Sequence, residues 1–245
     1  EAILANMKED TMKSRADGKL SQGRNFGALQ RYMMYGPEFI ARTTLSNDAL
    51  KALTSEQLLA KVRSLMGKQH EVLYYGPQPQ KELQSTLAAY HKVEGELAPL
   101  EKKFARPLLT DKNEVLLAQY DAKQLYYLQY SNRGEKFDLA ADPVITLYNE
   151  YFGGSMNAVV FQEMREARGL AYSASAWLST PSFADGSYSY LAFIATQNDK
   201  MQQAIEAFDE IINNMPESEA AFQIAKESLI SRLRTERTVR DQVLW

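Results

Sequence analysis

The 245-residue sequence contains no cysteine and only two histidines, His70 and His91. Without cysteine there is neither a disulfide framework nor a thiolate metal site, and the redox compartment stays open. A zinc site of the His-x-x-Glu-His kind needs two histidines on one helix face. His70 and His91 fall in separate predicted elements, and Glu71 follows His70 in a predicted strand, where neighbouring side chains point to opposite faces. We therefore expect two surface or half-buried histidines and no tight zinc site.

Long apolar runs and an excess of basic residues are also missing. No run approaches the ~20 apolar residues that cross a bilayer, and no charged-then-apolar leader opens the chain. The first residue is Glu1 rather than Met, which leaves room for a removed leader. With such a leader the protein would be exported, to the periplasm or cell envelope; the sequence alone leaves the compartment open. The net charge of -3 is spread over mixed acidic and basic residues, which argues against a nucleic-acid partner.

The length exceeds the ~100 to 150 residues of a common single domain, so two units are expected. After Val93 the helical periodicity fades, and Gly95, Pro99 and Pro107 gather among charges up to Lys112, as in an exposed linker. We predict a first part over 1–93, a linker over 94–112 and a second part over 113–245. The chain begins and ends inside predicted helices, which would suit a fragment that spans the back of one repeated module and the front of the next.

The first part is predicted to be mostly helical, with one strand. We expect a helix over 2–13, a turn-like or weakly helical break over 15–19, and a helix ended by Gly36-Pro37. Two helices capped by Ser46 and Thr54, a strand over 70–75 and a helix over 80–91 should follow. Thr54 to Gln57 matches the capping-box pattern. The helix that follows carries an apolar stripe that we expect to be buried: Leu58, Leu59, Val62, Leu65 and Met66.

The second part is predicted to combine strands with helices. Strands are expected over 114–120, 124–130 and 187–196, and helices over 142–151, about 201–214 and from Glu217 to the end of the chain. Between them, Gly153-Gly154 should end one element, and Ser155 or Asn157 can cap the next helix. Its buried face is expected to carry Met156, Val160, Met164 and Ala167.

Two polar-tipped side chains flank the end of this helix. Gly169 suits the left-handed residue that closes a helix, and Leu170 to Trp177 read as a strand. Arg165 lies in the last helical turn and Tyr172 at the start of the strand, so their tips can converge on one edge. The plain alternative for Arg165 is a solvated helix residue, because its one-turn neighbours offer no carboxylate. For Tyr172 it is a packed strand residue with its hydroxyl in water, and from the residues alone these alternatives are favoured.

Two other functions are disfavoured by the same residues. Gly153-Gly154 before a helix resembles a phosphate cradle, but Ser155-Met156 follows instead of the Lys-Ser/Thr of a P-loop. The aromatic strands around Tyr126-Tyr127 and Tyr188 to Phe193 could stack single-stranded nucleic acid, yet no basic stripe lies beside them. Sheet packing explains these aromatic residues better.

The stretch from Gly153 to Ser173 resembles the signature of the insulinase, pitrilysin and mitochondrial processing peptidase family. In this sequence it reads Gly153-Gly154-Ser155-Met156, then Phe161-Gln162-Glu163-Met164-Arg165-Glu166-Ala167-Arg168-Gly169-Leu170-Ala171-Tyr172-Ser173. The family pattern is Gly-Gly-Met-Ser-Ser-x-Leu-Phe-Gln-Glu-Leu-Arg-Glu-x-x-Gly-Leu-Ala-Tyr-Ser. Gly153, Gly154, Phe161 and Gly169 would thus be structural motif residues.

The resemblance implies an inverzincin zinc metallopeptidase, a hydrolase of α+β modules, each a mixed, mostly antiparallel sheet backed by helices, closed as a clamshell around a peptide. One module holds zinc through His-x-x-Glu-His, and its partner supplies an Arg and a Tyr, seven residues apart, to the substrate. Arg165 and Tyr172 match those positions, and this chain has no His-x-x-Glu-His. It is therefore similar to the inactive, substrate-binding half.

This half would have no catalytic residue and no cofactor of its own. It would be catalytically silent alone, and its partners would be a peptide substrate and a zinc-bearing module of the same parent chain. The alternative is a non-catalytic paralogue that acts as a scaffold or protein-binding module, as respiratory-complex core subunits of this family do. A His-x-x-Glu-His motif in the parent sequence would separate the two.

Overall fold

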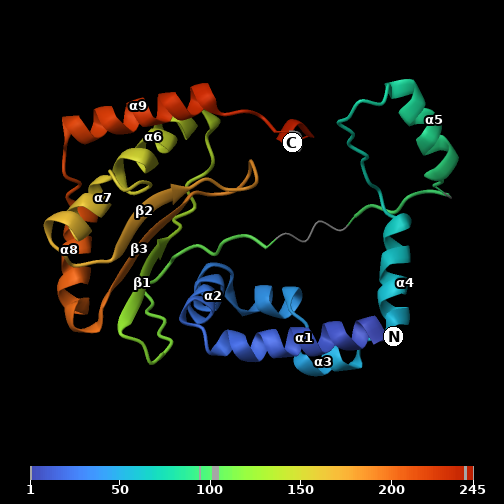
Figure 1. Cartoon of the computed structure of the whole chain (residues 1–245), viewed down its shortest axis with the longest axis horizontal. Coiled ribbons are helices and arrows are strands. Elements are labelled where there is room, and N and C mark those ends of the chain that lie inside the picture. Colours follow the sequence, from blue (N-terminus) through green and yellow to red (C-terminus); the bar gives the residue numbers. More distant parts are fainter. Residues whose placement is uncertain (1, 94, 101–104, 240–241, 245) are drawn as a thin grey trace. The chain divides into compact units, whose positions relative to one another are not determined.

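The chain folds into two compact units in the computed structural model, which describes residues 2–93, 95–100, 105–239 and 242–244 (Figure 1). Unit 1 comprises 1–15, 45–104 and 236–245, and unit 2 comprises 16–44 and 105–235. Packing thus joins 16–44 with the second half of the chain. The assignment of 1–93 and 113–245 to two family modules stays a prediction, because a module is defined by its repeat and a compact unit by its contacts.

Unit 2 is built on a three-stranded antiparallel sheet. Its strands are β1 (Gln124–Ser131), β2 (Ser173–Ser179) and β3 (Ser189–Gln197), in the spatial order β1-β3-β2. The helices of this unit are α2 (Gln22–Thr43), α6 (Asp142–Phe152), α7 (Val159–Phe161), α8 (Met201–Asn213) and α9 (Glu219–Thr235). The predicted α+β class with an antiparallel sheet backed by helices is confirmed.

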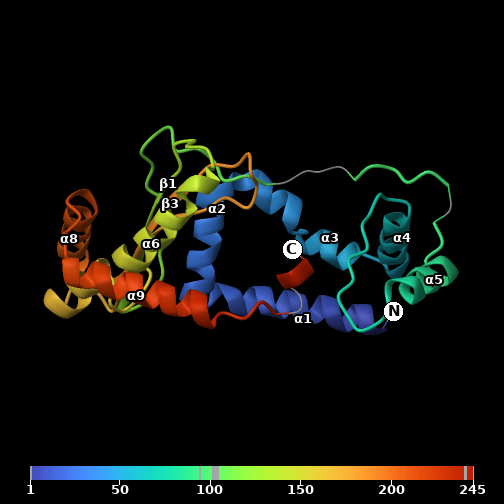
Figure 2. The ribbon, with the colours of Figure 1, turned by 90° about the horizontal axis from the view of Figure 1, so that it is seen from above.

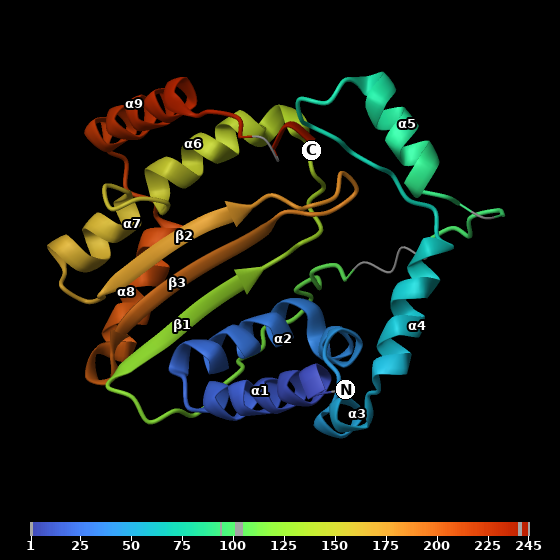
Figure 3. The ribbon, with the colours of Figure 1, turned by 45° about the vertical axis from the view of Figure 1, so that its right-hand side comes forward.

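Helices cover both faces of this sheet. Alternate residues of β3 point to opposite faces, so the contacts of Phe193 and Ile194 show which helices cover each face. On one side, the Phe26 ring of α2 packs 5.7 Å from the Phe193 ring and 5.4 Å from the Tyr126 ring. On the other side, Ile194 belongs to the buried cluster with residues of α6, α7 and α8. Figure 3 shows these helices across β2 and β3, with α9 against α6; Figure 2 shows the α6–α9 pair from above.

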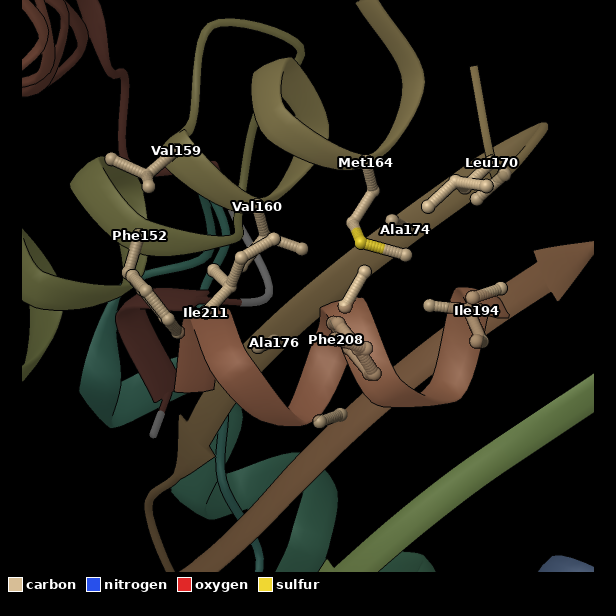
Figure 4. Packing of buried hydrophobic residues seen from close by; sticks show 14 of the residues in the cluster. Phe152, Val159, Val160, Met164, Leu170, Ala174, Ala176, Ile194, Phe208 and Ile211 are labelled. Carbon is tan, nitrogen blue, oxygen red and sulfur yellow. The ribbon is translucent and has the colours of Figure 1, made fainter. Parts of the chain in front are cut away.

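The core of unit 2 lies between the sheet and α6 to α8 (Figure 4). Its largest fully buried apolar side chains are Phe152, Phe208, Met164, Ile194, Ile211 and Val160. Burying each of these contributes about 1.5–3 kcal/mol. Since Val160 and Met164 come from the signature stretch, the core fixes the segment that carries Arg165.

The signature helix differs from the expected one. α7 is followed at once by a π-helix over Gln162–Ala167, and the wider turn moves Ala167 to the exposed side. Met156 precedes the helix and is 72 % exposed, so only two of the four predicted face residues are buried. Ala158 occupies the N-cap position without a side-chain bond; the predicted caps by Ser155 or Asn157 are wrong.

Unit 1 contains helices, two of which have the N-caps that the sequence predicts. They are the part of α1 (Ala2–Lys19) up to Arg15, α3 (Asn47–Ala52), α4 (Ser55–Met66) and α5 (Gln80–Tyr90). Ser46 accepts a bond from the Ala49 amide, and Thr54 and Gln57 form the predicted capping box. Of the two alternatives for 15–19, the turn is wrong and the helical one agrees with the structure, since α1 continues to Lys19. In unit 2, α2 consists of two helical pieces separated by a kink at Gly36 (φ 72°), so the first piece ends at Gly36-Pro37 as predicted and a second continues to Thr43.

Two predicted strands are absent, and one predicted core stripe is exposed. Residues 70–75 form no strand, and only a Lys68–Ala98 bridge lies near them. Residues 114–120 form no ladder either, with Val115 91 % exposed. The apolar stripe of α4 is exposed, since Leu50 is the one buried residue among those described in unit 1. Apolar composition alone supplies neither a ladder partner nor a packing partner.

The remaining elements are short or end early. Helix α9 stops at Thr235 rather than continuing to the end of the chain. Turns of 3-10 helix cover Leu139–Ala141, Asn198–Lys200 and Gln242–Leu244. The helix predicted over 201–214 is confirmed as α8, and Lys200 occupies its N-cap position without a side-chain bond.

Candidate functional site

The guanidinium of Arg165 lies over two aromatic rings. Its central carbon is 5.0 Å from the centre of the Phe161 ring and 5.5 Å from the centre of the Tyr172 ring. A guanidinium over an aromatic face at this range makes a cation–π contact worth about 0.5–1 kcal/mol at an exposed site. The structure thus brings together the two predicted site residues, and it adds Phe161 as a third.

The local backbone explains this convergence. In the π-helix, the Arg168 amide donates to the Glu163 carbonyl at 3.2 Å. Gly169 then adopts a left-handed conformation with φ 59°, as predicted. The Tyr172 amide donates to the Ala195 carbonyl at 2.8 Å, which attaches the following residues to β3. The helix end is therefore folded back over the start of β2, with Arg165 above Tyr172.

Arg165 has a carboxylate neighbour that the helical spacing did not indicate. Its Nε lies 3.5 Å from Oε1 of Glu166, and both side chains are partly exposed. Arg168 is paired more closely, at 2.8 Å from Glu210 and 3.6 Å from Glu163. The hydrogen bond that Arg168 donates to the Glu210 carboxylate raises the pKa of Arg168 above its usual value. The guanidinium of Arg168 is therefore occupied by structural ion pairs. The guanidinium of Arg165 forms only the exposed ion pair through Nε among the described residues, which leaves its terminal N–H groups for a ligand.

A hollow of about 310 Å³ lies beside Arg165 and Tyr172. Its lining comes from the π-helix and the turn after it, from the ends of β1 and β3, and from the turn before α8; it consists of Gln124, Arg165, Gly169, Leu170, Ala171, Tyr172, Thr196, Gln197 and Lys200. Lys200 donates from Nζ to the Gly169 carbonyl at 3.1 Å. No sequence motif identifies Lys200 as a site residue. It lies at the hollow because β3 ends next to the turn that contains Gly169.

Gly153 and Gly154 do not line this hollow. A Cβ on Gly153 would lie 2.1 Å from the Ala176 carbonyl oxygen, and one on Gly154 would lie 2.7 Å from the Asn149 carbonyl oxygen. Gly153 allows the end of α6 to approach the backbone of β2, and Gly154 allows the chain to turn closely against the last turn of α6. Next to them, the Asn149 amide accepts from the Leu178 amide at 2.8 Å and donates to the Leu178 carbonyl at 3.0 Å, a contact that the sequence did not indicate.

The two histidines meet in unit 1, contrary to the expectation of separate positions. Their Nε2 atoms are 2.7 Å apart, and Nδ1 of His70 lies 2.7 Å from the Lys68 carbonyl oxygen. The cause is the turn between α4 and α5, which the predicted strand would have straightened. Within the described ranges no group of three or more His, Asp or Glu is placed to hold a metal ion. A peptidase zinc therefore does not fit the residues described.

In the described part of the chain, no helix is both long and apolar enough to cross a membrane.

Solved structures of three proteins resemble this chain in fold. A peptidase M16 inactive domain from Pseudomonas fluorescens has a TM-score of 0.62 and 17% identity, with 94% of this chain and 56% of that chain covered. The ferredoxin protease FusC, a mutant in complex with Arabidopsis ferredoxin, has a TM-score of 0.66 and 15% identity, with 95% and 25% covered. A protease from Helicobacter pylori has a TM-score of 0.50 and 13% identity, with 78% and 47% covered.

This chain spans about half of the first of these proteins and a quarter of FusC. Among curated proteins, none matches it significantly. Residues 53–229, more than half of the chain, match the family described as "Peptidase M16 inactive domain". The predicted resemblance to the inactive half of insulinase-type peptidases is confirmed, and the chain belongs to the peptidase M16 inactive domain family.

Proposed function

We propose that this chain is the substrate-contacting, non-zinc half of an insulinase-type metalloendopeptidase, and that Arg165 and Tyr172 bind the peptide near the bond to be cleaved. The observation that carries the proposal is the contact of the Arg165 guanidinium with the Phe161 and Tyr172 rings beside the hollow. The likeness to a ferredoxin protease solved with ferredoxin supports a role in holding a protein chain.

The chemistry of the two side chains suits a peptide carbonyl. Arg165 offers a fork of N–H donors, and Tyr172 offers a hydroxyl on a side chain that is 69 % exposed. When a carbonyl is attacked, negative charge develops on its oxygen, and donors held in place stabilise that charge. Contact with two rings limits the rotamers of Arg165, so less freedom is lost when it bonds to the substrate.

The zinc of such an enzyme would have to come from another module of the same parent polypeptide, since the described residues here do not form a zinc site. Zinc there would supply an activated water. What this half contributes is binding and charge stabilisation by Arg165 and Tyr172. We therefore expect the 245-residue chain to bind peptides and to cleave none.

The outer edge of β2 is partly covered. Asn149 bonds both backbone groups of Leu178, and Gly153 lies against Ala176. A peptide cannot pair with β2 at these two positions unless α6 moves. The proposal therefore rests on side-chain contacts at the Tyr172 end of the strand rather than on an added strand along all of β2.

The test compares variants of the full-length protein. A hydrogen bond to a charged group is worth about 1.5–3 kcal/mol, so Arg165→Ala should lower kcat/KM for peptide cleavage roughly 10- to 100-fold. Tyr172→Phe should lower it in the same direction. Arg234→Ala, an exposed change in α9, should leave cleavage unchanged. Zinc content and Tm should stay near the wild-type values in all three.

Two results would contradict the proposal. If both site variants cleave peptide at the wild-type rate, Arg165 and Tyr172 have no role in cleavage. If activity is lost only together with a fall in Tm, the two residues are structural. A full-length protein with no His-x-x-Glu-His and no cleavage, which still binds protein partners, would favour the scaffold function instead.

A further inference from the structure

The hollow beside Arg165 is lined by positive charge without negative charge. Arg165 and Lys200 are its two ionised lining residues, and none of the described residues that line it is Asp or Glu. Tyr172 adds a hydroxyl group. A concave surface with two cations and no carboxylate favours an anionic ligand group.

Lys200 is held in place and lacks a counter-ion. Its side chain is half-buried, and Nζ donates to the Gly169 carbonyl at 3.1 Å. An ammonium group has three donors, so two remain after this bond. Lys200 forms no ion pair with any carboxylate in the described ranges, whereas Arg168 nearby is paired with Glu210. An anion that entered the hollow would complete the hydrogen bonding of Lys200.

The size of the hollow limits the ligand. About 310 Å³ is at the lower end of the range for small-molecule sites, roughly 300–1,000 Å³. It can take one side chain or a chain end, and an elongated peptide would have to continue outside it. A carboxylate is the anionic group that peptides carry, and it matches both the fork of Arg165 and the point charge of Lys200.

We propose that this hollow binds a carboxylate group of the peptide and that Lys200 selects for it. The inference rests on the proposed peptide binding at Arg165 and Tyr172 and adds a preference for acidic peptides. The carboxylate belongs either to an Asp or Glu side chain or to the C-terminus of the peptide. Both sources present the same chemistry to Lys200, and the experiment separates them.

The experiment measures the binding of fluorescein-labelled peptides to the whole 245-residue chain by anisotropy. One peptide is neutral with an amidated C-terminus, a second has one Gln replaced by Glu, and a third is neutral with a free C-terminal carboxylate. We expect at least one acidic peptide to bind roughly tenfold more tightly than the neutral one, as a charge-assisted hydrogen bond would give. The peptide with the larger gain identifies the source of the carboxylate.

Variants of Lys200 assign the preference. Lys200→Gln can keep the bond to Gly169 but loses the charge, so the ratio of acidic to neutral affinity should fall towards one. Lys200→Arg keeps the charge and should retain the preference. Lys226→Gln removes the same charge from an exposed position of α9 and should leave the ratio unchanged. Circular dichroism verifies that each variant is folded.

Each unfavourable result has a separate meaning. If wild type binds acidic and neutral peptides equally, the carboxylate site is excluded while peptide binding stands. If Lys226→Gln lowers the ratio as much as Lys200→Gln, the preference is a general charge effect and the role of Lys200 is overturned. If no peptide binds at millimolar concentration, the proposed function fails, and the carboxylate site fails with it.

Discussion

A methyl group on Gly153 would lie 2.1 Å from the carbonyl oxygen and 2.3 Å from the amide nitrogen of Ala176. Both neighbours are backbone atoms of β2, so neither can turn away as a side chain does. Gly153→Ala should therefore force α6 away from the sheet and lower the free energy of unfolding by about 3 kcal/mol, the upper end of the cost of overpacking. Urea unfolding followed by circular dichroism measures the change.

A matched glycine provides the control. Gly23 lies in α2, and an added Cβ there meets nothing within 4 Å. Gly23→Ala should be neutral or stabilising by up to about 1 kcal/mol, because alanine is the better helix former. Equal stability of the Gly153→Ala and Gly23→Ala variants would show that the contact between Gly153 and Ala176 is looser than described.

Gly169 should respond differently, because its constraint is conformational. Its φ of 59° is left-handed, yet an added Cβ would meet no atom within 4 Å. Gly169→Ala should cost about 1–2 kcal/mol, the penalty of a left-handed L-residue. Gly169→Asn should cost less, since asparagine tolerates this region better. Urea unfolding followed by circular dichroism measures both changes in the free energy of unfolding. A Gly169→Ala variant as stable as wild type would contradict the left-handed conformation of Gly169.

Features set by neighbouring residues could be predicted from the sequence. The capping box of Thr54 and Gln57 and the left-handed Gly169 both form as expected. Each depends on residues within one helical turn, so no distant partner has to be known. Arg165 and Tyr172 were identified through family resemblance, and the contact between them follows from the turn at Gly169.

Features that need a distant partner could not be predicted. The segment around Val115 has strand-like composition but no neighbouring strand, and the α4 stripe around Val62 has no packing partner among the described residues of unit 1. The π-helix shifts Ala167 out of the periodic face. Lys200 reaches the site only because the end of β3 lies beside Gly169. The periodicity of a single sequence cannot predict that two distant segments lie next to each other.

Alkaline pH should weaken unit 2 through Tyr190. Its hydroxyl is shielded from solvent without a well-formed hydrogen bond, next to the Tyr148 phenol. Burial, followed by the repulsion between the Tyr190 phenolate and the neighbouring Tyr148 phenol, raises the pKa of Tyr190 well above its usual value. The unfolded chain loses the proton above a pH of about 10, where the folded chain keeps it. The stabilising contribution is thus complete below pH 10 and is lost as the pH rises further.

The measurement is urea unfolding at several pH values between 8 and 11. Wild type should lose about 1 kcal/mol by pH 11 through this group, a figure reduced for its partial exposure. Tyr190→Phe should lose less, and at pH 8 it should be at least as stable as wild type, because the hydroxyl lacks a partner. Tyr90→Phe, at a position that is 87 % exposed, should follow wild type. Parallel pH curves for wild type and Tyr190→Phe would exclude this source of alkaline sensitivity.

Phe161 should act as a positioning residue for Arg165. Its ring is the nearer of the two that hold the guanidinium, at 5.0 Å. Phe161→Leu keeps an apolar side chain of similar bulk but removes the aromatic face. Because an exposed cation–π contact is worth about 0.5–1 kcal/mol, the variant should bind peptide two- to fivefold more weakly. Anisotropy titration of the labelled peptides measures this change.

Phe161→Tyr distinguishes this role from ordinary packing, since it restores an aromatic face and should restore peptide affinity. Binding is compared at a temperature where circular dichroism shows both variants folded, so that lost stability does not count as lost affinity. In the Arg165→Ala background, Phe161→Leu should have no further effect, because the cation it positions is gone. Additive losses in the double variant, or equal affinities of Phe161→Leu and Phe161→Tyr, would show that Phe161 does not act through Arg165.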